Sequence, residues 1–137
     1  MTLGSVNHLS LTVSDRSKSE PFYNAILGFM GYQQVEKTDE FIMWWLKDAG
    51  AILIYTGNPN SPNKIHDRYS PGLHHLAFNA GSREQVDNLY KLIVEIGATV
   101  LDPPAEYNHY APGYYAVFFA DPDGIKLELV YMPNLPE

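Results

Sequence analysis

The sequence has 137 residues, a formal net charge of −7 and no cysteine. Without cysteine, disulfides and thiolate metal sites are excluded, so any metal must be bound by histidine nitrogens and carboxylate oxygens. The negative charge is unsuited to a nucleic-acid backbone or an anionic membrane surface, so we expect neither as a partner.

The chain is long enough for one compact domain, and 45% of its residues are apolar, which allows a real core. Residues 1–13 lack the basic and long apolar regions of a signal peptide. No apolar run approaches the length of a membrane span. We therefore expect a cytoplasmic protein.

The first half of the chain predicts a strand, a helix and three further strands. Residues 6–13 alternate between apolar and polar side chains, as a half-buried strand requires. Residues 14–28 combine capping residues, an apolar stripe and a final glycine, which predicts a helix. Three apolar runs then predict strands at 32–38, 40–46 and 50–56.

The second half repeats this order after a linker. Asn, Pro, Ser and Gly crowd residues 57–71, which indicates irregular chain. A strand is predicted at 73–79 and a helix at 82–97, where Ser82 and Gln85 form a capping box. The last three predicted strands are 98–104, 114–120 and 125–132.

The two halves align with each other. His8 matches His75 where HLSL superposes on HLAF, and Gly50 matches Gly124 in the late hairpins. We predict one α+β domain over residues 1–137, made of two tandem βαβββ modules at about 1–56 and about 72–133. The modules are expected to form a curved, incompletely closed eight-stranded barrel-like sheet with the helices outside.

Three side chains are candidates for a metal site. Period-two alternation puts His8, His75 and Glu128 on the faces that the helices do not cover, and a curved sheet would bring them together. Two imidazoles and one carboxylate are a recognised metal set that leaves positions for water or substrate. The alternative is that each histidine is a hydrogen-bonded core residue and the glutamate is solvated.

The other histidines are assigned no metal role. Alternation turns His74 toward the helix side, where we expect a structural function. His66 and His109 fall in loops, and we expect His66 at the surface and His109 over the cleft.

The segments NHLSLTVSD, FYNAILGF, HHLAF and YYAVFFADPDGIKLELV resemble the vicinal oxygen chelate superfamily over nearly the whole chain. That superfamily includes glyoxalase I, extradiol dioxygenases, methylmalonyl-CoA epimerase, fosfomycin-resistance proteins and bleomycin-binding proteins. The resemblance implies a metal site made by the first and last strands of the modules. By that resemblance, the ligands of a divalent ion (Zn, Mn, Fe, Ni or Mg) are His8, His75 and Glu128.

One position departs from the four-ligand members. Aligned on the glycines, Glu128 matches Ile54, which puts the resemblance to glyoxalase I and the epimerase in doubt. A two-His, one-Glu set is more similar to extradiol dioxygenases and fosfomycin-modifying enzymes. We rank fosfomycin modification low, because residues 106–124 contain no Lys or Arg and Lys126 is the nearest cation.

The resemblance implies a metal-dependent lyase, isomerase or dioxygenase whose small organic substrate chelates the ion through vicinal oxygens. Tyr114 is the candidate acid or base, and a hydrogen-bonded wall residue is the equal alternative. The residues expected to line the substrate pocket are Trp44, Ile54, Tyr110 and Phe118.

A different function is also open. The acidic charge, the aromatic content and the missing fourth ligand suit a metal-free sequestering protein of the bleomycin-resistance type. The superfamily habit implies a homodimer, and the sequence leaves open whether one site draws residues from one chain or from two.

Overall fold

The structure is a computed structural model that describes residues 2–61 and 65–135. The chain divides into two compact units, Met1–Lys64 and Ile65–Glu137. Residues 62–64 of the predicted linker, and the ends of the predicted domain at 1 and 136–137, lie outside the described residues.

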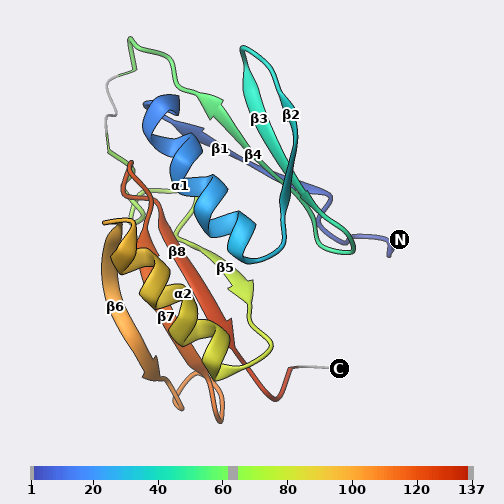
Figure 1. The fold of residues 1–137 in the computed structure, drawn as a ribbon, viewed down its shortest axis with the longest axis vertical. Coiled ribbons are helices and arrows are strands. Elements are labelled where there is room, and N and C mark those ends of the chain that lie inside the picture. The colour runs from blue at the N-terminus through green and yellow to red at the C-terminus, as the bar shows by residue number, and fades with distance from the viewer. Residues whose placement is uncertain (1, 62–64, 136–137) are drawn as a thin grey trace. The chain divides into compact units, whose positions relative to one another are not determined.

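Each unit has the order strand, helix, three strands (Figure 1). The elements of the first unit are β1 (His8–Val13), α1 (Arg16–Phe29), β2 (Gln33–Lys37), β3 (Phe41–Leu46) and β4 (Gly50–Thr56). The elements of the second unit are β5 (Leu76–Asn79), α2 (Arg83–Glu95), β6 (Thr99–Glu106), β7 (Tyr115–Ala120) and β8 (Lys126–Tyr131). The predicted α+β fold with a duplicated element order is confirmed.

The described strands form two four-stranded sheets and no closed barrel, with the orders β1-β4-β3-β2 and β5-β8-β7-β6. In each sheet the first and last strands of the unit are parallel neighbours. This pairing places the start of the first strand beside the last strand. His8 therefore lies near β4, and His75 lies near β8.

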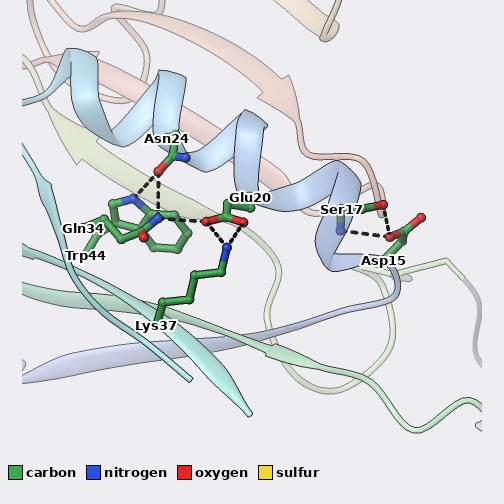
Figure 2. A network of polar contacts seen from close by, with 7 residues as sticks. All are labelled: Asp15, Ser17, Glu20, Asn24, Gln34, Lys37 and Trp44. Atoms are coloured by element: carbon green, nitrogen blue, oxygen red, sulfur yellow. Dashed lines mark hydrogen bonds and ion pairs between the residues drawn. The ribbon is translucent and has the colours of Figure 1, made fainter. Parts of the chain in front are cut away.

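Helix α1 is held to its sheet by apolar packing and by polar contacts (Figure 2). The side chains of Tyr23, Ile26 and Leu27 are fully buried. The indole nitrogen of Trp44 on β3 donates to Asn24 Oδ1 at 2.9 Å, and Lys37 Nζ on β2 pairs with Glu20 Oε1 at 2.8 Å. These contacts identify the face of the first sheet that α1 covers.

Helix α2 begins much as its capping box predicts. The Ser82 side chain accepts from the backbone N–H of Gln85 at 3.2 Å. The return bond differs, because Gln85 Oε1 accepts from the backbone N–H of Gly81 at 2.6 Å. Gly97 follows the helix with φ +71, the left-handed conformation expected of a helix stop. Neither α1 nor α2, the helices of the described residues, has the length and apolar character needed to cross a membrane.

Two strand boundaries differ from the sequence prediction. Strand β5 starts at Leu76, and the residues before it are irregular. In the preceding loop, the carbonyl oxygen of Leu73 lies 2.8 Å from the His66 imidazole, so this carbonyl contacts a side chain and not a neighbouring strand. Strand β6 continues to Glu106 through Pro103 and Pro104, where the register with β7 shifts. Strand β6 is at the edge of its sheet, and the register shift between Asp102 and Ala105 accommodates the two prolines, which have no N–H to donate.

We predict that Gly50→Ala destabilises the protein more than Gly97→Ala does. Both residues have positive φ, +101 and +71, and alanine in this conformation costs about 1–2 kcal/mol. A Cβ at Gly50 would also lie 2.4 Å from the carbonyl oxygen of Asn7, whereas one at Gly97 meets nothing within 4 Å. Urea unfolding of the two variants measures the difference, and equal losses of unfolding free energy would contradict the steric account.

Candidate functional site

Glu128 lies on the face of the second sheet that α2 does not cover, here called the open face. The Tyr115 hydroxyl on β7 donates to Asp87 Oδ1 of α2 at 2.6 Å, so the alternating residue Phe118 points away from that helix. The strand register places Glu128 between Phe118 and Ala77. Glu128 and Phe118 therefore face the same way, on the open face.

The carboxylate of Glu128 is almost completely buried, with 1% of the residue exposed. A buried carboxylate is costly unless hydrogen bonds or counter-charges compensate it. Here Oε1 lies 3.2 Å from His75 Nε2, and Oε2 accepts a hydrogen bond from the Tyr114 hydroxyl. One residue before β5 and one before β7 therefore converge on an acid carried by β8.

His75 is also in contact with its sequence neighbour. His74 Nδ1 and His75 Nδ1 lie 2.7 Å apart, so one ring donates to the other. The prediction that His74 points toward the helix side is wrong, because the two histidines precede β5 and do not alternate as strand residues do. His74 is exposed and lies beside His75.

Tyr114 has a raised pKa. Burial is the largest cause, followed by the hydrogen bond to Glu128 and the charge of that carboxylate. All three disfavour the phenolate, so Tyr114 is a protonated hydroxyl at neutral pH. Of the two alternatives that the sequence left open, the structure displays the hydrogen-bonded one, with the hydroxyl donating to Glu128.

Aromatic rings surround this carboxylate on the open face. Phe118 is buried and packs edge to face on Tyr107, with ring centroids 5.4 Å apart. Tyr107 in turn stacks on Tyr110 at 5.6 Å and meets Tyr114 at 6.3 Å. The structure thus brings two predicted pocket residues, Tyr110 and Phe118, into one cluster. Sequence reasoning missed Tyr107, although the aromatic run from 107 to 110 was the available signal.

The other two predicted pocket residues lie elsewhere. Trp44 contacts Asn24 and the Tyr23 ring of α1, so it is on the helix-covered face of the first sheet. Ile54 shares that face, because it pairs with Ile42, two residues before Trp44 on β3. This corrects the expectation that Trp44 and Ile54 line the open side of the sheet.

The register also corrects the internal alignment. His75 precedes Ala77 by two residues, and Ala77 pairs with Glu128. His8 precedes Ser10 by two residues, and Ser10 pairs with Leu53. The counterpart of Glu128 in the first unit is therefore Leu53 and not Ile54. The prediction that this position has no carboxylate holds for Leu53 as well.

The remaining histidines differ in their surroundings. His8 begins β1, is exposed, and has Nδ1 2.7 Å from Asn7 Oδ1. His66 is half-buried and contacts Leu73, so the expected surface position is only partly correct. His109 is exposed and lies against Tyr110, with ring centroids 4.2 Å apart.

The donor chemistry of the second unit suits a divalent ion in part. An imidazole nitrogen and a buried carboxylate are adjacent, and both are ordinary ligands of Zn, Mn, Fe or Ni. Within neither unit do three His, Asp or Glu side chains of the described residues gather closely enough to hold a metal. The prediction that His8 is a third ligand stays a prediction.

Known proteins with similar sequences and folds share this architecture. The family model of the Glyoxalase/Bleomycin resistance protein/Dioxygenase superfamily matches residues 5–129. The Bacillus subtilis protein YqjT, itself uncharacterized, is 34% identical over 125 residues, which are 91% of this chain and 97% of YqjT. The metallothiol transferase FosB of Lysinibacillus sphaericus is 30% identical over 130 residues, which are 93% of this chain and 82% of FosB.

Solved structures agree with the sequence comparison. The crystal structure of a glyoxylase/bleomycin resistance protein/dioxygenase domain from Frankia superposes with a TM-score of 0.78 at 28% identity, over 95% of this chain and 98% of that one. The family model covers the strands and helices of both units up to Leu129. The chain therefore belongs to the glyoxalase/bleomycin resistance protein/dioxygenase superfamily.

Proposed function

We propose that the protein is a metal-dependent enzyme that acts on a small organic substrate with two neighbouring oxygen atoms. The observation that carries this proposal is the contact of 3.2 Å between His75 Nε2 and the buried Glu128 carboxylate. An acid this deeply buried needs a strong partner, and a divalent ion is a stronger one than an imidazole.

The proposed ligands are His75 and Glu128 of the second unit and His8 of the first. When bound, the metal would supply Lewis acidity, since it would chelate two substrate oxygens and stabilise negative charge on them. His8 is exposed at the start of its strand, which keeps its imidazole available as a ligand.

The chain's own residues would prepare this site. Tyr114 donates to Oε2 of Glu128 and so fixes the carboxylate, leaving Oε1 on the side of His75. The Phe118 and Tyr107 rings cover the neighbouring part of the open face and would exclude water. With its raised pKa, Tyr114 suits the role of a hydrogen-bond donor better than that of a base.

The similarity to FosB favours a second candidate within the same class. The name of that relative describes a metallothiol transferase, so the corresponding activity here would join a thiol to a small electrophile at the metal. Thiol addition and lyase or dioxygenase chemistry would use the same three ligands. The co-substrate distinguishes them, because only the transferase consumes a thiol.

The metal proposal predicts one divalent ion per chain, at roughly 1:1 stoichiometry, after metal-free purification and reconstitution. Glu128→Gln and His75→Ala should each weaken Mn²⁺ or Zn²⁺ binding at least about tenfold, because each removes a ligand. His109→Ala is the matched control and should bind normally. Calorimetric titration gives the affinities, and undiminished binding by Glu128→Gln would contradict the proposal. Tight binding of a cationic aromatic ligand by the metal-stripped protein would favour the sequestering alternative.

A homodimer that shares its sites between chains predicts complementation. Neither His8→Ala nor Glu128→Ala protein alone should bind metal tightly. A co-refolded mixture should regain about one quarter to one half of the sites if each site combines His8 of one chain with Glu128 of another. Metal content of the mixture measures this recovery, and no recovery would assign each site to a single chain.

Tyr114→Phe should destabilise the metal-free protein more than Tyr115→Phe. Each substitution removes one hydroxyl that donates to a carboxylate. Glu128 is buried and would be left with an unsatisfied oxygen, which costs about 1–3 kcal/mol, whereas half-buried Asp87 can regain water. Urea unfolding at pH 7 compares the two, and a smaller loss for Tyr114→Phe would show that its hydrogen bond does not stabilise Glu128.

A further inference from the structure

The loop before β5 is fixed against the turn that leads into β8. The backbone N–H of His66 donates to the carbonyl oxygen of Asp123 at 3.0 Å, and the His66 ring contacts Leu73 at 2.8 Å. Within the loop, Asp67 accepts hydrogen bonds from the Tyr69 backbone at 3.0 Å and the Ser70 hydroxyl at 2.8 Å. The loop is therefore held at a defined place beside the start of β8.

This placement connects two cations to the His74 and His75 pair through aromatic rings. The Arg68 guanidinium lies 4.9 Å from the centre of the Tyr69 ring, and that ring meets the His74 ring edge to face at 5.9 Å. On β8, Lys126 Nζ lies 4.6 Å from the centre of the Phe118 ring, which is 6.4 Å from the His75 ring. One continuous series of contacts thus joins Arg68 to Lys126 through both histidines.

Neither cation forms an ion pair with a carboxylate of the described residues, although the charge of Arg68 does act on the adjacent Asp67. Across residues 2–61 and 65–135, the Lys and Arg ion pairs join Lys37 to Glu20 and Arg83 to Glu106, and none includes Arg68 or Lys126. Arg68 Nε is buried and has no hydrogen-bond acceptor in that part of the chain. A buried N–H of a charged group without an acceptor is costly, and a bound anion would relieve the cost.

The ring contacts therefore link both cations to the His75–Glu128 pair, in a protein whose net charge is −7.

We propose that Arg68 and Lys126 form a subsite for an oxyanion, beside the His75–Glu128 pair. The group that it would bind is a carboxylate, phosphonate or phosphate on the small substrate. The guanidinium fork suits two oxygens of such a group, and the lysine supplies a point charge. The role of the subsite in substrate recognition rests on the proposed function, whereas anion binding itself does not.

The test uses metal-free protein and three simple probes, namely inorganic phosphate, methylphosphonate and acetate. Chemical-shift titration of the wild type should show saturable binding of at least one probe. Arg68→Gln and Lys126→Gln should each weaken that binding at least about tenfold, because each removes a charge-assisted contact. Lys91→Gln, on the exposed side of α2, is the matched control and should bind as the wild type does.

Two further measurements sharpen the result. Arg68→Lys keeps the positive charge but lacks the planar guanidinium, so it should retain part of the anion affinity. It also serves as a second variant if Arg68→Gln does not fold. Tighter binding of phosphate or methylphosphonate than of acetate would assign a dianionic group, and the reverse would assign a carboxylate. No saturable binding, or equal affinities for the wild type and Arg68→Gln, would overturn the subsite.

Metal titration separates this inference from the proposed function. Arg68→Gln and Lys126→Gln should bind metal as the wild type does, whereas Glu128→Gln should lose metal and still bind the anion. If anion binding depends on Arg68 while no variant or wild type binds metal, the subsite stands and the metal proposal fails. If the protein binds metal but neither Arg68→Gln nor Lys126→Gln changes the anion affinity, the subsite is wrong and the metal proposal stands.

Discussion

The buried carboxylate of Glu128 is the constraint on which the candidate site depends. Only 1% of this residue is exposed, so its charge needs partners that the chain must deliver from other elements. His75 reaches Oε1 and Tyr114 reaches Oε2, one from before β5 and one from before β7. The parallel pairing of β5 with β8 makes this meeting possible, because it sets His75 beside the strand that carries the acid.

Much of the fold follows from local sequence rules. Alternation in β1 and the caps and apolar stripes of α1 and α2 act over a few residues, so the duplicated element order was predictable. Alternation on β8 likewise gave the face of the strand on which Glu128 lies. The meeting of His75 with Glu128 needed only the further assumption that the first and last strands of a unit are neighbours.

The predictions are wrong where a one-residue difference in strand register, or a contact between distant residues, determines where a side chain lies. Aligning the halves on Gly50 and Gly124 gave Ile54 as the counterpart of Glu128, but strand pairing gives Leu53, and one residue reverses the face. Trp44 was expected to line the pocket, whereas its indole nitrogen donates to Asn24 of α1. Arg68 was overlooked because it lies before β5, outside the segment in which cations were sought. The hydrogen bond from His66 to Asp123 holds its loop beside the start of β8.

The side chain at Leu53 has a chemical consequence. A hydrocarbon has no lone pair to donate, so the duplicated scaffold offers fewer metal donors than its internal symmetry would permit. An ion held as proposed by two imidazoles and one carboxylate would keep roughly three of about six octahedral coordination positions for exchangeable oxygen atoms. These open positions would let a bidentate ligand bind and leave during turnover, which an ion fully coordinated by the polypeptide would not allow.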